Sequence, residues 1–142
     1  MDTLPMVLRP EGGELRAPVQ PLRVLGIDLG TTNSTAAEIA WHPDHGAPSQ
    51  ARCLEVEQAT SEGTYIHILV PSVVAFNKNN ERLVGRVARN QGIINSQNTV
   101  FSIKRFMGRK FSDPEVQRTL PRIPYKVTSA DNGDIRVIMG EK

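Results

Sequence analysis

The segment VLGIDLGTTNST, residues 24–35, joins a short apolar run to a turn rich in hydroxyl groups. The apolar run predicts a buried strand that begins at residue 23 and ends at Asp28. Residues 30–33 have the side chains of a turn, and STAAEIAW (34–41) has the length of a returning strand, although its alanines also favour a helix. We therefore expect a strand, a tight turn and a second strand.

The same turn has the chemistry of an anion site. A chain that holds an anion needs converging N–H groups, small residues that let the backbone approach, and donor hydroxyls. The candidate residues are Gly30, Thr31, Thr32 and Asn33. Asp28 precedes them, and because a carboxylate beside a phosphate needs a cation between the two, it indicates Mg²⁺ held largely through water. The simpler alternative is a hairpin whose polar groups only satisfy their own turn.

Composition restricts the class of protein. A chain of 142 residues with 39% hydrophobic and 23% charged residues fits one soluble globular domain. Its single cysteine, Cys53, excludes an internal disulfide and favours a cytoplasmic location. No run approaches the roughly 18 apolar residues that span a membrane. Residues 1–22 carry four prolines and a Gly-Gly pair, and we interpret them as a flexible leader rather than a signal peptide.

The remaining pattern predicts short strands and helices, which makes the fold class α/β. Asn132-Gly133 between two alternating runs is a strong hairpin signal. Ser112 is the expected N-cap of a helix from Asp113 towards Leu120, which Pro121 ends. The other expected elements are strands at 51–58, 67–76 and 82–85, a loop at 58–64, a helix at 86–95 weakened by Gly92, and a second short helix at 98–108 ended by Gly108.

The motif GIDLGTTNS (26–34) resembles the first phosphate-binding hairpin of the seventy-kilodalton heat-shock chaperones, the DnaK-type family. The similarity extends to later segments of that family's ATPase domain, in the same order, and covers roughly residues 24–139. These segments are LVPSVVAF (69–76), LVGRVARNQ (83–91), NSQNTVFSIKRFMGRKF (95–111), DPEVQR (113–118) and ADNGD (130–134).

The resemblance implies part of an actin-like, ribonuclease-H-like ATPase lobe, over residues 23–142. By matching motif, Asp28 would order the water shell of Mg²⁺, and Thr31, Thr32 and Asn33 would contact the phosphates of ATP or ADP. Lys104, in SIKRF, matches the family's catalytic lysine, a compact cation that can stabilise charge developing in phosphoryl transfer. The implied partners are unfolded polypeptide clients, bound by a domain absent here, a J-domain co-chaperone and a nucleotide exchange factor.

Two other functions stay open at this stage. Nothing in the sequence matches the family's second phosphate loop, its adenosine-binding segment or its substrate domain. The chain is therefore also consistent with a non-enzymatic module that keeps the phosphate-binding hairpin without a working cleft. Residues 82–122 hold nine basic and two acidic side chains, a net charge of +7. Interleaved with Phe101, Phe106 and Phe111, this charge is compatible with nucleic-acid binding, although a core position for each ring is the more economical interpretation.

Overall fold

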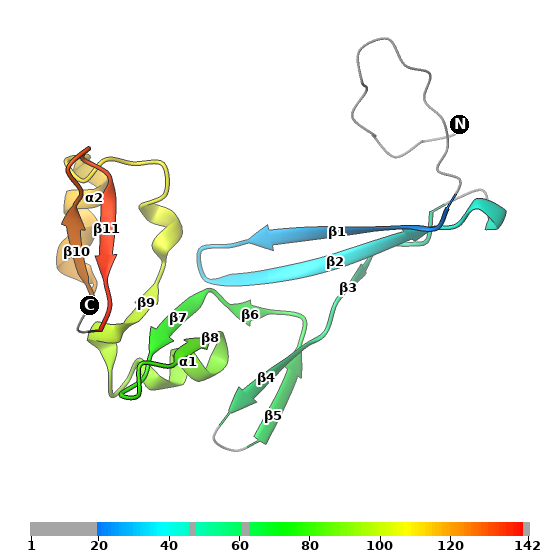
Figure 1. Cartoon of the computed structure of the whole chain (residues 1–142), viewed down its shortest axis with the longest axis horizontal. Helices are drawn as coiled ribbons and strands as arrows, with labels where there is room; N and C mark the ends of the chain where they lie inside the picture. The colour runs from blue at the N-terminus through cyan, green and yellow to red at the C-terminus, as the bar shows by residue number, and fades with distance from the viewer. Residues whose placement is uncertain (1–19, 46–47, 61–62, 141–142) are drawn as a thin grey trace, which may run out of the picture.

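The computed structural model describes residues 20–45, 48–60 and 63–140. Most of the leader predicted at 1–22 lies outside these ranges, but Leu22 already belongs to the first strand. That strand, β1 (Leu22–Leu29), pairs antiparallel with β2 (Asn33–Trp41) over its whole length, with Asp28 opposite Thr35. The expected strand, turn and strand are therefore confirmed, and the two strands form the long hairpin of Figure 1.

The other edge of β2 connects this hairpin to the rest of the chain. β3 (Arg52–Cys53) pairs with the middle of β2, and β6 (Val70–Pro71) pairs with its start, opposite Asn33 and Ser34. β1 has no second strand partner among the described residues. Its side chains are exposed on both faces, including Leu25 at 56% and Ile27 at 63%. The strand predicted to be buried is thus an exposed edge strand.

The central part of the chain builds two small sheets around a short helix. β4 (Val56–Thr60) and β5 (Gly63–His67) form a hairpin, and β7 (Val73–Phe76) lies between β8 (Arg82–Val84) and β9 (Thr99–Phe101). The helix α1 (Arg86–Gln91) packs against β7, β8 and β4. Its only buried residue, Ala88, meets Val73 and Ala75 in a small apolar cluster.

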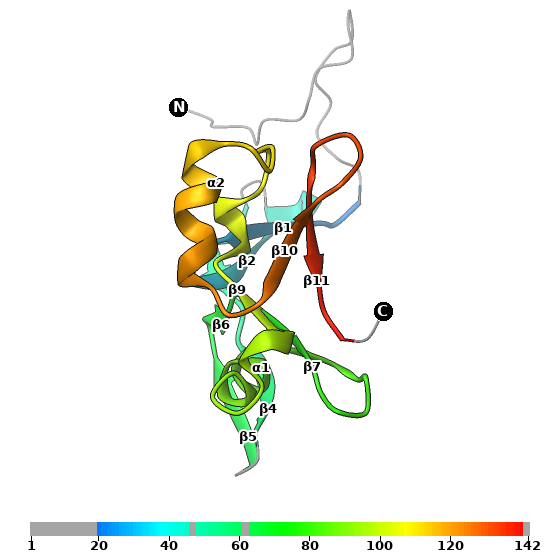
Figure 2. The same cartoon turned by 90° about the vertical axis from the view of Figure 1, so that its left-hand side faces the viewer.

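The C-terminal part contains the larger core. The helix α2 (Pro114–Thr119) and the hairpin of β10 (Lys126–Ser129) with β11 (Ile135–Ile138) lie together in both views (Figures 1 and 2). Val100, Phe106, Val116 and Tyr125 are buried between them. The hairpin predicted from Asn132-Gly133 is confirmed, and Gly133 has the positive φ of 79° that this turn requires.

The helix expected at 98–108 is wrong. Thr99–Phe101 form the strand β9, and only a single 3₁₀ turn, Ile103–Arg105, follows it. Between them Ser102 adopts a left-handed conformation with φ 55° and ψ 24°, which no α-helix can contain. The β-branched Thr99 and Val100 favour pairing with β7, and this tertiary contact outweighs the local helical pattern.

Three smaller expectations also differ. The N-cap of α2 is Asp113, not Ser112, because the Asp113 carboxylate accepts the Glu115 N–H at 2.8 Å. The loop expected at 58–64 contains the ends of β4 and β5, with only 61–62 outside the described residues. The strand expected at 51–58 is split into β3 and the start of β4.

The two remaining helix predictions hold in modified form. The helix expected at 86–95 is present but shorter, since Gly92 ends it. After α2 the chain continues through Pro121 as a 3₁₀ turn, Leu120–Arg122.

Candidate phosphate-binding site

The turn between β1 and β2, residues 30–33, is the centre of the candidate site. Gly30 is required there by close packing, since a Cβ added to it would lie 2.2 Å from the Asn33 carbonyl oxygen. The backbone therefore folds back more tightly than any side chain at position 30 would permit. Such close approach, beside the hydroxyls of Thr31 and Thr32, is the geometry that lets backbone N–H groups face an anion.

Ser72, between β6 and β7, is hydrogen-bonded to this turn through both its side chain and its backbone. Its Oγ donates to the Gly30 carbonyl at 2.8 Å and lies 2.8 Å from Ser34 Oγ. Its backbone N–H donates to the Thr32 carbonyl at 2.9 Å. Sequence reasoning missed Ser72, although it falls inside the LVPSVVAF segment that carried the resemblance.

A cavity of about 330 Å³ opens beside the 30–33 turn. Thr31, Thr32 and Ser72 line it together with Arg89, in the last turn of α1, and Ser102, which precedes the 3₁₀ turn. The rest of the wall is formed by Gly92, Ser96, Thr99 and the apolar Val73, Ile93 and Phe101. The lining combines hydroxyl donors with one guanidinium, a donor set suited to phosphate oxygens.

Four predicted site residues do not line this cavity: Gly30 and Asn33, which belong to the turn itself, and Asp28 and Lys104. Asp28 is exposed on β1, two residues before Gly30. Lys104 is exposed on the 3₁₀ turn, two residues after Ser102. The structure thus brings the segments of both residues to the turn. Ser72, Arg89 and Ser102 join the site through tertiary contacts alone, so no spacing in the sequence indicated them.

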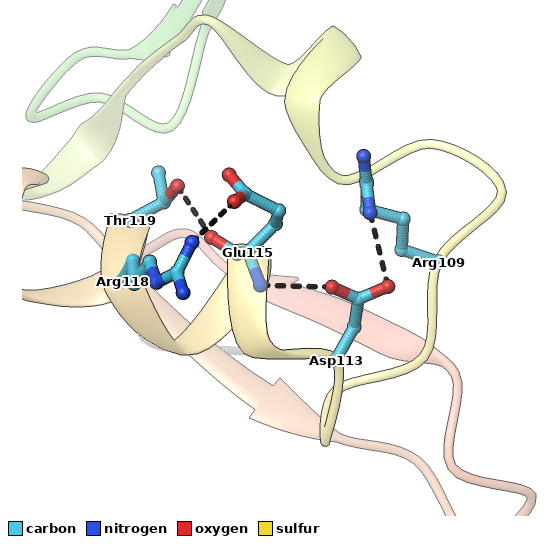
Figure 3. Close-up of polar contacts among 5 residues, drawn as sticks. All are labelled: Arg109, Asp113, Glu115, Arg118 and Thr119. Atoms are coloured by element: carbon cyan, nitrogen blue, oxygen red, sulfur yellow. Dashed lines mark hydrogen bonds and ion pairs between the residues drawn. The ribbon is translucent and has the colours of Figure 1, made fainter.

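Four of the nine basic side chains in the segment 82–122 make structural contacts. Around α2, Arg109 pairs with Asp113 at 3.0 Å and Arg118 with Glu115 at 2.7 Å, as Figure 3 shows. The Glu115 N–H and the Arg109 guanidinium lower the pKa of Asp113.

Two other cations of the segment have structural partners outside it. Lys110 bonds to Asp134 at 2.7 Å, and this contact, with the Asn132 amide, lowers the pKa of Asp134. Arg86 stacks on Tyr65, with its guanidinium carbon 3.7 Å from the ring centroid. Phe106 is buried, and Phe101 packs edge-on against Tyr125. Phe101 and Phe106 therefore pack in the core, as the more economical interpretation of these rings expects.

Comparison with known proteins identifies the family to which this chain belongs. The family described as "Hsp70 protein" matches residues 24–142, and the chain belongs to the Hsp70 family. One relative is heat shock protein SSC3, mitochondrial, of Saccharomyces cerevisiae, 45% identical over 114 residues. The match covers 80% of this chain but 16% of that relative. The small mixed sheets and short helices are consistent with part of the actin-like ATPase lobe of this family.

One sequence-based expectation, the location in the cell, gains no support from the comparison. The relative carries a mitochondrial name, so the cytoplasmic location expected from composition stays a prediction. In the described part of the chain, neither helix is long and apolar enough to cross a bilayer.

Proposed function

We propose that this chain forms one wall of an ATP site in an Hsp70 chaperone, whose hydrolysis of ATP is coupled to binding and release of unfolded polypeptides. The proposal rests mainly on the tight 30–33 turn, which presents hydroxyls and backbone to a cavity lined by Arg89. In the family, ATP or ADP is bound together with Mg²⁺.

Each residue has a distinct role in this proposal. Thr31, Thr32 and Asn33 contact phosphate oxygens, and Asp28 holds the water shell of Mg²⁺. Lys104 supplies a compact positive charge where negative charge develops during phosphoryl transfer. Clients, a J-domain co-chaperone and an exchange factor are the partners that the family implies, and they belong to the same proposal.

Calorimetric titration of the 142-residue chain with Mg-ATP tests the binding step. We expect saturable binding that Gly30→Ala abolishes, because the new Cβ collides with the Asn33 carbonyl. Gly26→Ala is the matched control, since its Cβ would meet only the Ala37 oxygen at an ordinary 3.8 Å. Absence of heat from the unmodified chain would instead favour the non-enzymatic module.

A further inference from the structure

The 30–33 turn is held in place by a residue far away in sequence. Ser72 lies 42 residues after Gly30 and 38 after Ser34, and its contacts reach both ends of the turn. A serine hydroxyl has one donor hydrogen and two acceptor lone pairs. Since Ser72 Oγ donates its hydrogen to the Gly30 carbonyl, the Ser34 hydroxyl must donate to Ser72 Oγ. The result is a directed chain of hydrogen bonds from Ser34 through Ser72 to Gly30.

This arrangement fixes the orientation of two peptide planes. The Gly30 carbonyl and the Thr31 N–H belong to one planar trans peptide and point in opposite directions. The Thr32 carbonyl, which accepts the Ser72 N–H, shares a peptide in the same way with the Asn33 N–H. By holding both carbonyls, Ser72 directs the N–H groups of Thr31 and Asn33 away from itself.

We propose that Ser72 is the positioning residue of the phosphate site: it sets the direction of the turn's N–H groups before any ligand arrives. This inference rests on the proposed function for the identity of the ligand, but the locking of the turn does not depend on it. Pro71 supports this arrangement of hydrogen bonds between Ser72 and the turn. It is buried and pairs with Asn33 through β6, and its ring restricts the backbone immediately before Ser72. The site therefore needs no reorganisation of its backbone on binding.

Amide hydrogen exchange on the full chain, without nucleotide, tests the lock directly. In Ser72→Ala we expect the amide of residue 72, which donates to the Thr32 carbonyl, to exchange about five- to tenfold faster, because the side-chain bond that holds the turn beside it is lost. Amides of the 126–138 hairpin should keep their rates. Ser34→Ala should give a smaller local change, because the bond from Ser72 to Gly30 remains. Ser129→Ala, whose hydroxyl bonds to the neighbouring Ala130 carbonyl, is the matched control and should leave the exchange rate of the residue 72 amide unchanged.

A purely structural role would give a different pattern. If Ser72→Ala accelerated exchange throughout residues 63–140, or left the amide of residue 72 unchanged, the positioning role would be overturned. Ser72→Thr restores the hydroxyl and should restore slow exchange. If Ser72→Ala does not fold, Ser72→Cys replaces it, since a thiol is a weak donor of similar size and should give the same local acceleration.

Mg-ATP titration of the same variants separates this inference from the proposed function. If the unmodified chain binds Mg-ATP, the affinity should fall about tenfold in Ser72→Ala and recover in Ser72→Thr. Unchanged affinity in a variant with a loosened turn would overturn the role of Ser72 in binding. If the unmodified chain does not bind, the proposed function fails, and the exchange rates still decide whether Ser72 locks the turn.

Discussion

The C-terminal region around α2 and the hairpin of β1 and β2 differ in how many buried side chains each contains. The C-terminal region encloses its own core, with Val116 fully buried and Phe106 and Tyr125 each 3% exposed. The hairpin carries the candidate site but has no fully buried side chain in either strand. Its attachments to the rest of the chain are the short pairings of β2 with β3 and β6, together with side-chain bonds such as those of Ser72. The candidate site therefore lies in a part of the structure that has no buried core of its own.

The largest expected effect is the loss of a ring from the C-terminal core. Phe106→Ala should lower the free energy of unfolding by about 3–5 kcal/mol, because it leaves a cavity among close-packed neighbours. Leu25→Ala in β1, where the side chain is 56% exposed, should stay within about 0.5 kcal/mol. Urea denaturation of both variants measures the contrast. An equal decrease in the free energy of unfolding for both variants would mean that Leu25 contributes as much to stability as the buried Phe106, contrary to this comparison.

Lys104→Ala tests whether the site needs both regions, since Lys104 comes from the segment that follows β9. In the longest natural form of the protein, we expect the rate of ATP hydrolysis to fall about 10²–10³-fold with little change in nucleotide affinity. Single-turnover hydrolysis separates the two quantities. Arg105→Ala, next to it on the same exposed turn, is the control and should hydrolyse ATP normally. An unchanged rate in Lys104→Ala would remove this residue from the site.

Alkaline unfolding should report on the C-terminal core through Tyr125. Burial raises the pKa of Tyr125 to about 12, whereas an unfolded tyrosine titrates near 10. The folded state thus favours the neutral phenol. Its contribution to stability is complete below about pH 10 and is lost as the pH rises towards 12.

Tyr125→Phe should flatten this decline in stability between about pH 10 and 12. It should also cost about 1 kcal/mol at neutral pH, because the bond from the phenol to the Phe101 carbonyl is lost. Melting temperatures across this range measure both effects. Tyr65→Phe serves as the comparison, and a decline of the same steepness in both variants would contradict the assignment to Tyr125.

The smallest expected effect concerns the cap of α2. Asp113→Ala should lower the melting temperature by a few degrees, because the Glu115 N–H loses its acceptor. Since this N–H and Arg109 lower the pKa of Asp113, its contribution is present above the pKa of an unfolded aspartate and is lost on acidification through the folded value. Ser112→Ala should have almost no effect. The reverse result would restore Ser112 as the cap.

Sequence was informative where local chemistry decides the structure. Asn132-Gly133 predicted the terminal hairpin, since few residues other than glycine accept the φ of 79° found at Gly133. The hydroxyl-rich turn at 30–33 was found for the same reason. The prediction of a helix at 98–108 was wrong because Thr99–Phe101 pair with β7, and local sequence does not show a contact between segments so far apart. Ser72 and Arg89 were missed for the same reason, since their place in the cavity lining depends on which distant segments meet there.

The long-range contacts of Ser72 also have a consequence for the order of folding. The hairpins of β4–β5 and β10–β11 join residues a few positions apart, and such structures form within microseconds. The hydrogen bonds from Ser72 to Ser34 and Gly30 join residues that are 38 and 42 positions apart. The chain loses conformational entropy when it closes such loops, and this loss comes before the bonds can form. We expect the bonds between Ser72 and the turn to form after these local hairpins, so a refolding assay that follows the amide of residue 72 should lag behind one that follows the 126–138 hairpin.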